Sequence, residues 1–460
     1  MKQLLTIVAI LTVFLAGCGK FKKPEQIKAE PDYKLLEAPD WSANANIYEV
    51  NIRQYTPEGT FNAFAEHLPR LKEMGVDILW LMPVHPISEK NRKGSLGSYY
   101  AAQDYKAINP NFGTEEDFRN LVAKIHESGM KIILDWVPNH TGFDHVWTKT
   151  NPDFYNKDSL GNITHPKDTD WTDVADLNYD NPDMRKAMTD AMLYWITDFD
   201  IDGYRCDVAG FVPNDFWEAN NKALFAKKHV FMLAEWEDPA LHEVGFHMTY
   251  GWGFHHLMKE VAQKQKGVKD ILAFFKDEQT KFKTSAYKMN FIDNHDENSW
   301  NGTMEKRFGK AVDLMAVFAF TSHGMPLMYS GQEAGLNKTL LFFEKDSIDW
   351  KYKDKTAFYK TLLNLKHNNK GIWNGIHGGQ MTVIDTDNPD KILVYEREKD
   401  GEKVLVALNF SDKPQSFKTV NALAAGEMNE IFQNRKIDPS LWKTTITKLG
   451  PWSYLVLSSK

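Results

Sequence analysis

The chain has 460 residues, of which 42% are apolar and 25% are charged, as is ordinary for a soluble globular protein with a full core. The formal net charge of −7 gives no electrostatic reason to expect binding to nucleic acid or to an anionic membrane surface. The 14 tryptophans fit either large cores or exposed rings that stack on flat ligands, and composition alone favours the cores.

The first twenty residues, MKQLLTIVAILTVFLAGCGK, contain an apolar run (4–15) and small residues before Cys18. The run is too short to span a bilayer comfortably and has signal-peptide proportions. LAGC resembles the lipobox of bacterial lipoproteins, in which the cysteine is lipidated; an ordinary cleaved signal is the alternative. We therefore predict a signal peptide over 1–18, lipidation at Cys18 and a Pro-bearing tether over 19–42. The prediction implies a lipid-anchored protein of the bacterial cell envelope, at the outer membrane or the cell surface.

From about residue 46 onward, strand-like and helix-like segments alternate. Short apolar runs, typical of strands buried on both faces, lie at 46–55, 76–84, 130–137, 201–208, 229–236, 246–250, 287–293 and 325–331. Helical patterns lie between most of them, the clearest at 60–75, 115–129, 182–199 and 213–226. This alternation implies a parallel sheet, and eight units imply a closed eight-stranded β/α (TIM) barrel. An open doubly wound sheet is the alternative, but no Gly-rich phosphate loop follows the first strand.

Two segments break this rhythm. Residues 141–179 are polar, rich in aromatics and without a clear period, so we expect an inserted loop domain after the third strand, on the catalytic rim of the barrel. After about residue 370 the chain turns into short alternating strands such as MTVIDT and KVLVALNF, which indicate a C-terminal antiparallel β-sandwich. We place the barrel at 43–368 and the sandwich at 369–460.

Acidic residues gather where the predicted strands end, which is where β/α barrels carry their catalytic side chains. In chain order these ends carry Asp135, Asp207, Glu235 and Asp293, the last followed closely by His295 and Asp296. A single acid of this kind is more simply explained as a cap on the following helix. Four consecutive examples, together with two histidines and an arginine, indicate a functional site.

Arg205 and Asp207 are two residues apart on a predicted strand, so both side chains should point into the top of the barrel. The guanidinium favours the ionised carboxylate, which can then act as a nucleophile. Glu235, on the next strand, has no arginine two residues away and should hold its proton more tightly. One ionised and one protonated acid across a small gap is what glycoside hydrolysis requires. Metal-dependent hydrolysis is the alternative chemistry for paired carboxylates. It would need histidine and aspartate side chains crowded into one ligand set, whereas the two histidines here lie on distant predicted strands.

Four segments, DWVPNH, GYRCDVA, AEWE and FIDNHD, resemble in order the four conserved sequence regions of the α-amylase superfamily, glycoside hydrolase family 13. DLNYDNP is similar to its fifth region, and YYAAQDYKAINPNFGT resembles the aromatic loop after its second strand. The resemblance runs from about residue 46 to residue 332, and PWSYLVLSS is like the close of the family's C-terminal domain.

The resemblance implies an enzyme: a retaining glycoside hydrolase that cleaves α-1,4-glucosidic bonds of starch-like glucans or maltodextrins by double displacement. It implies that Asp207 is the nucleophile and Glu235 the general acid/base. Asp296 matches the third acid, which binds sugar hydroxyls and favours a distorted ring.

The resemblance also implies a set of substrate-binding residues. Arg205 matches the arginine that orients the nucleophile, and His140 and His295 match histidines that hydrogen-bond hydroxyls of the sugar being cleaved. Tyr100 matches the tyrosine that stacks under that sugar, although the adjacent Tyr99 is an alternative.

The chain departs from the family at one place and leaves calcium open at another. Many α-amylases carry Lys-His at the third and fourth places after the nucleophile, where this chain has Gly210 and Phe211, so the lysine contact to the sugar beyond the cleavage point is lost. Asn139 and Asp176 match side-chain calcium ligands. The resemblance therefore implies calcium, although relatives without the ion carry similar residues, and it implies no organic cofactor.

Three alternatives remain open at this point. An exo-acting α-glucosidase or a transglycosylase of the same superfamily would use the same acids, because the choice among these activities rests on loop shape. A non-catalytic glucan-binding lipoprotein would have no need to keep all three acids. The expected partners are an α-glucan or maltooligosaccharide and, through the lipid anchor, a membrane; nucleic acid is not expected.

Overall fold

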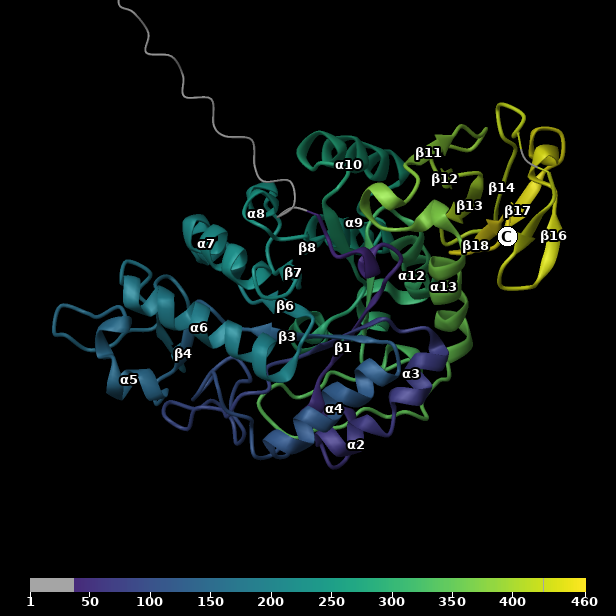
Figure 1. The fold of residues 1–460 in the computed structure, drawn as a ribbon. Coiled ribbons are helices and arrows are strands. Elements are labelled where there is room, and N and C mark those ends of the chain that lie inside the picture. The colour runs from purple at the N-terminus through teal and green to yellow at the C-terminus, as the bar shows by residue number, and fades with distance from the viewer. Residues whose placement is uncertain (1–36, 425) are drawn as a thin grey trace, which may run out of the picture.

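The computed structural model describes residues 37–424 and 426–460, so Cys18, the predicted signal peptide and most of the predicted tether lie outside the described residues. Eight parallel strands close into a barrel in the order β1–β10–β9–β8–β7–β6–β3–β2, which confirms the predicted fold (Figure 1). The strands are β1 (Ile47–Val50), β2 (Ile78–Leu81), β3 (Lys131–Trp136), β6 (Gly203–Cys206), β7 (Phe231–Ala234), β8 (Met248–Tyr250), β9 (Tyr287–Asn290) and β10 (Met325–Tyr329).

The strands are buried on both faces. Side chains such as Ile47, Trp80 and Leu233 fill the barrel interior, whereas the intervening side chains, such as Tyr48 and Leu79, pack outward against the helices. This double burial is why the strands form nearly continuous apolar runs in the sequence.

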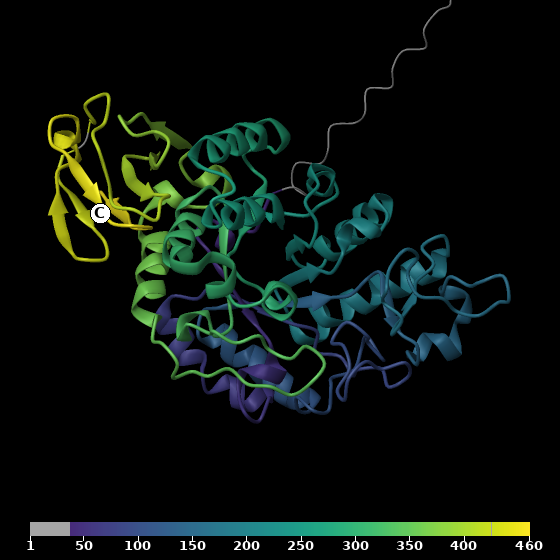
Figure 2. The same ribbon diagram turned by 180° about the vertical axis from the view of Figure 1, so that it is seen from behind.

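Helices surround the barrel (Figures 1 and 2). The longer ones are α3 (Leu68–Met74), α4 (Glu115–Glu127), α6 (Pro182–Phe199), α7 (Asn214–Phe225), α9 (Trp252–Ala262), α10 (Val268–Lys281), α12 (Val312–Thr321) and α13 (Thr356–Asn368). The short ones are α1 (Ile52–Tyr55), α2 (Phe61–Ala65), α5 (Val146–Thr150), α8 (Pro239–Glu243) and α11 (Met304–Phe308). Among residues 37–424 and 426–460 we find no helix with the length and apolar character needed to cross a bilayer.

Two predicted elements are shorter than expected. The first strand ends at Val50, and the rest of the predicted segment forms the helical turn α1. The predicted helix over 60–75 is divided into α2 and α3, with Pro69 in the first turn of α3. Proline lacks a backbone N–H and is tolerated only in the first turn of a helix, so a new helix begins there instead of continuing α2.

The inserted segment after β3 and the C-terminal domain lie on opposite sides of the barrel (Figures 1 and 2). In the insertion, β4 (His140–Gly142) pairs with β5 (Val174–Asp176) in antiparallel fashion. The C-terminal domain has a six-stranded sheet and a two-stranded sheet, whose apolar side chains share one core. The strands are β11 (Met381–Ile384), β12 (Ile392–Lys399), β13 (Glu402–Asn409), β18 (Tyr454–Ser458), β15 (Met428–Glu430) and β16 (Arg435–Ile437), then β14 (Gln415–Phe417) and β17 (Thr447–Leu449).

Candidate active site

Asp207 and Glu235 are neighbours because their strands are in register. Cys206 of β6 pairs with Ala234 of β7, and each acid directly follows its paired residue. The backbone N–H of Glu235 donates to Cys206 at 2.9 Å, which fixes the two strand ends at one level. Both acids were expected at the top of the barrel, and the structure places them there.

Arg205 joins the acids of this region. Its guanidinium donates to Asp135 at 2.7 Å and to Asp207 at 3.0 Å, and it forms an ion pair with Glu235 at 2.9 Å. Its Nε donates to the Tyr250 hydroxyl at 3.2 Å. The contact with Glu235 was not foreseen from the sequence, because the strand pattern shows only which residues share a face of one strand. One fully buried cation therefore holds both candidate catalytic carboxyls.

Burial separates the proton affinities of the two acids. Desolvation raises the pKa of Asp207 to about 6 against the opposing Arg205 guanidinium. Desolvation, again opposed by Arg205, and the charges of Asp207 and Asp296 raise the pKa of Glu235 to about 8. Between these values the pair carries one ionised and one protonated carboxyl, with the proton on Glu235.

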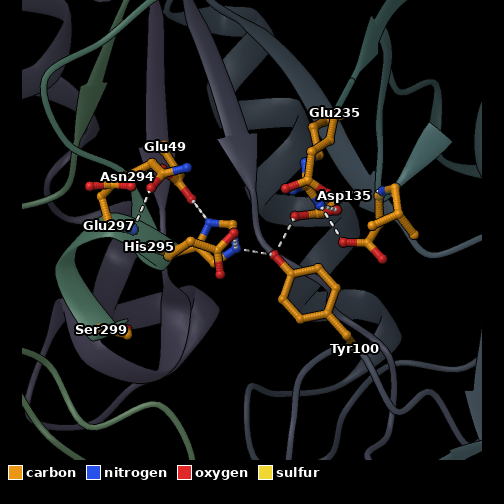
Figure 3. Close-up of polar contacts among 12 residues, drawn as sticks. Glu49, Tyr100, Asp135, Glu235, Asn294, His295, Glu297 and Ser299 are labelled. Atoms are coloured by element: carbon orange, nitrogen blue, oxygen red, sulfur yellow. Dashed lines mark hydrogen bonds and ion pairs between the residues drawn. The ribbon is translucent and has the colours of Figure 1, made fainter. Parts of the chain in front are cut away.

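Tyr100 lies between His295 and Asp135, with Glu235 nearby (Figure 3). The Tyr100 hydroxyl lies 2.7 Å from His295 Nε2 and donates to Asp135 at 3.0 Å, and the two rings are stacked. His295 Nε2 also lies 3.3 Å from the carboxylate of Asp296. Tyr99 instead packs against Arg53, away from the cleft, so it is Tyr100 that faces the candidate site.

His140 also lines the cleft but differs from His295 in charge. Its Nδ1 accepts from the Asn139 amide at 3.2 Å, and its ring lies 5.5 Å from that of Trp171. Burial lowers the pKa of His140 to about 3, so its imidazole is neutral at ordinary pH. The family resemblance assigned both histidines to the same sugar but gave no information about their charge states.

The predicted residues surround a cleft of about 510 Å³. Tyr100, His140, Asp207, Glu235, His295 and Asp296 all line it. Lining residues that the sequence analysis did not name are Lys93, Ser98, Asp170, Trp171, Asp173, Val174, Val208, Trp300, Phe342 and Phe343. The aromatic richness of the inserted segment was the one signal that pointed toward any of them.

Gly210 and Phe211 stand where many α-amylases carry Lys-His after the nucleophile. A Cβ atom at Gly210 would lie 2.3 Å from the Trp236 ring, so no larger residue fits there while that ring stays in place. Phe211 is 49% exposed, and its ring lies 5.3 Å from Trp236 and 6.2 Å from Trp171. An aromatic row, Trp171–Phe211–Trp236, therefore starts at Trp171, which lines the cleft.

Residues 39–371 match the alpha amylase catalytic domain, and residues 381–456 match the maltogenic amylase C-terminal domain. The chain belongs to the α-amylase family. It is thus an enzyme of the glycoside hydrolase class, and the family resemblance inferred from the sequence is confirmed.

Similar proteins include other α-amylases. The alpha-amylase MalA of Haloarcula japonica is 26% identical over 82% of this chain, which spans only 57% of that relative's length. The solved structure of a noncanonic maltogenic alpha-amylase from Thermotoga neapolitana has a TM-score of 0.81 at 29% identity, and covers 90% of this chain and 98% of its own. Both the barrel and the C-terminal sheets therefore have counterparts among α-amylases.

One relative corrects the predicted location. The intracellular maltogenic amylase of Bacillus subtilis is 27% identical over 97% of this chain and 79% of the relative. Its name places that relative inside the cell, which contradicts our prediction of a lipid-anchored envelope protein. We withdraw that location; the predicted lipid anchor at Cys18 and the membrane partner are not supported.

Asn139 and Asp176, the two residues matched to calcium ligands, lie close together. His140 pairs with Asp176 across β4 and β5, and the Asn139 carbonyl accepts from Leu177 N at 3.2 Å. One Asp176 oxygen accepts from Asn156, and residues 37–424 and 426–460 hold no cluster of three or more His, Cys, Asp or Glu suited to a metal. Calcium takes six to eight oxygens, so these two side chains cannot form its site by themselves. Calcium at this place stays a prediction.

Proposed function

We propose that the protein hydrolyses α-1,4-glucosidic bonds of starch-like glucans and maltodextrins with retention, using Asp207 as nucleophile and Glu235 as general acid/base. The observation that carries this proposal is the shared guanidinium of Arg205, which contacts both carboxyls at the cleft. Hydrolysis of α-1,4-glucans is also consistent with the names of the maltogenic amylases that the chain resembles.

The reaction follows from the charge states of the two acids. Ionised Asp207 attacks the anomeric carbon and forms a glycosyl ester, while protonated Glu235 gives its proton to the departing glycosidic oxygen. Glu235, now ionised, takes a proton from water, whose oxygen then attacks the same carbon and releases Asp207. Two inversions give net retention. Asp296, His140 and Tyr100 line the cleft where they can hold the sugar ring.

Chromatography of the products from maltoheptaose, with proton NMR of the first product, tests this proposal. We expect shorter maltooligosaccharides whose new reducing ends appear first as the α-anomer. If the β-anomer appears first, the enzyme inverts configuration, and Asp207 is not the nucleophile.

The pKa values of the two acids predict a bell-shaped pH dependence. Asp207 must be ionised to attack, so activity is lost as the pH falls through its pKa of about 6. Glu235 must be protonated to assist the leaving group, so activity is lost as the pH rises through its pKa of about 8. We expect kcat/KM to peak near neutrality. Each limb of the profile reports the interacting pair of acids and not one residue alone. A kcat/KM that stays flat between about pH 5 and about pH 9 would contradict this assignment.

A second candidate activity is glycosyl transfer to a sugar acceptor, and the exposed Phe211 favours it. Glu235 protonates the leaving oxygen, so the leaving sugar must lie on its side of the cleft. Trp236 directly follows Glu235 in the chain, and its ring lies 5.3 Å from that of Phe211. Aromatic faces bind the apolar faces of sugar rings and keep them from leaving quickly. A sugar retained there can attack the glycosyl ester in place of water.

Replacement of Phe211 by alanine should therefore lower the ratio of transfer to hydrolysis products by about 3- to 10-fold, the loss expected when about 1 kcal/mol of stacking is removed. Long products formed from concentrated maltotriose give the readout. Phe211→Tyr keeps the ring and should keep the ratio. Leu160, which is 84% exposed in the inserted segment after β3, gives the control Leu160→Ala, which should change nothing. An unchanged ratio in Phe211→Ala would remove this role.

A further inference from the structure

Glu49 is a fully buried acid for which the reaction described above has no use. It lies within β1, where it pairs in register with Trp80 of β2 and Tyr329 of β10, and it is 0% exposed. Its side chain belongs to the inward-facing set of the barrel, as does that of Ile47 two residues before it. The carboxyl therefore lies behind His295, which lines the catalytic cleft, and comes from a strand that carries none of the predicted site residues.

The carboxyl of Glu49 has one side-chain partner. Its Oε1 lies 2.5 Å from His295 Nδ1, and its Oε2 has no hydrogen-bond partner (Figure 3). A buried carboxylate is stable only when an opposite charge or several donors compensate it. Among the groups described around this carboxyl, the imidazole of His295 is the one that can supply a full positive charge at such short range.

The other face of His295 points to the same charge state. Its Nε2 lies 2.7 Å from the Tyr100 hydroxyl and 3.3 Å from the Asp296 carboxylate. A neutral ring with its proton on Nδ1 would present a lone pair from Nε2 to Asp296, and the two would repel. A protonated ring instead offers an N–H at both nitrogens, one to Glu49 and one to Tyr100 and Asp296.

We propose that Glu49 is a positioning residue that keeps His295 as an imidazolium, and that this cation orders the hydrogen bonds beneath the bound sugar. This inference deepens the proposed function and rests on it for its effect on catalysis. The imidazolium donates from Nε2 to Tyr100, which leaves the Tyr100 hydroxyl proton free to point at Asp135 at 3.0 Å. Asp135 in turn accepts from Arg205, whose guanidinium holds Asp207.

The charges around His295 agree with this direction. Burial opposes a charged ring, but the carboxylates of Asp296 and Glu49 outweigh it and raise the pKa of His295 to about 9, although Arg205 of β6 acts against them. Tyr100 packs against one face of the ring, and Trp80 of β2 approaches its edge. His140, which has no such acid beside it, stays neutral in the same cleft.

The test is an NMR titration of the His295 imidazole in the whole protein, with ¹⁵N-labelled histidine and His295→Gln to assign the signal. In the wild type we expect a protonated ring at pH 7. In Glu49→Gln, which keeps the shape and removes the charge, we expect the pKa of His295 to fall by at least about one unit. The alkaline limb of kcat/KM should then move to lower pH, because His295 becomes neutral in the same pH range in which Glu235 loses its proton. Glu49→Asp keeps the charge and should restore part of both shifts.

Glu333→Gln is the matched control. Glu333 is another buried barrel acid, but it pairs with Tyr48 at 2.7 Å and Arg70 at 2.9 Å on the outer side of β1, so its loss should lower the melting temperature and leave the His295 titration unchanged. A neutral His295 at pH 7 in the wild type, or an unchanged His295 pKa in Glu49→Gln, overturns the proposal. The wild-type measurement does not depend on the folding of Glu49→Gln. It is also independent of turnover, so it separates failure of this inference from failure of the proposed function.

Discussion

Asp207→Asn should lower kcat on maltoheptaose by about 10⁴- to 10⁶-fold, the range seen when a catalytic nucleophile is removed. The amide cannot form the glycosyl ester, and the binding groups around it give only a residual rate. The fold should remain, because Arg205 still has Asp135 and Glu235 as partners, and the variant buries one charge fewer. Initial rates and the melting temperature, measured on the same preparation, check both points.

Asp202→Asn provides the control for this result. Asp202 precedes the same strand, β6, at the opposite end of the barrel, where it pairs with His126 at 2.8 Å and Lys228 at 3.1 Å. Its replacement should cost stability and leave kcat nearly unchanged. A folded Asp207→Asn protein that retains more than about a tenth of the wild-type rate would rule out covalent catalysis by this residue.

Glu235→Gln should slow the hydrolysis of natural glucans by about 10²- to 10⁴-fold, the usual contribution of a general acid. A substrate with a good leaving group, such as a fluoride, needs little protonation and should lose much less in the glycosylation step. The alkaline limb of the pH profile should also disappear on that substrate. The ratio of the two rate losses is the quantity to measure.

Glu237→Gln is the corresponding control, because this acid lies two residues beyond Glu235 and points away from the cleft. It pairs with Lys288 at 2.7 Å and accepts from the backbone of Gly253 at 2.8 Å. Its variant should show the same modest change on both substrates. Equal losses on both substrates in Glu235→Gln would contradict a role as the acid.

The barrel and its acids could be predicted from the sequence because both depend on short-range pattern. Buried parallel strands form apolar runs, and an acid directly after such a run must lie at the same rim as its neighbours. The spacing of Arg205 and Asp207 fixed their common face for the same reason. Helix boundaries could not be predicted as closely as the strands, because one residue can end a helix within a periodic pattern. The division of the predicted helix before Pro69 is an example.

The remainder of the site could not be predicted because it depends on contacts between distant loops. Trp300 lies on the π-helical turn Glu297–Asn301 and Phe342 follows β10, yet their rings are 5.1 Å apart at the cleft. The hydrophobic periodicity of each segment gives no information about such a contact between distant segments. Glu49 was missed for a different reason: it lies within a strand and not after it, so a search of strand ends passes over it.

The fit of Trp236 over Gly210 limits the order in which this site can change during evolution. A side chain introduced at Gly210 alone would collide with the indole, since even its Cβ would lie 2.3 Å from the ring. The lysine that many family members carry at this place therefore cannot be reached by one substitution; Trp236 must first become smaller or turn away. A smaller residue in place of Trp236 would in turn remove the ring that lies 5.3 Å from that of Phe211. A larger side chain at Gly210 therefore requires a change at Trp236 as well, so we expect these two positions to change together.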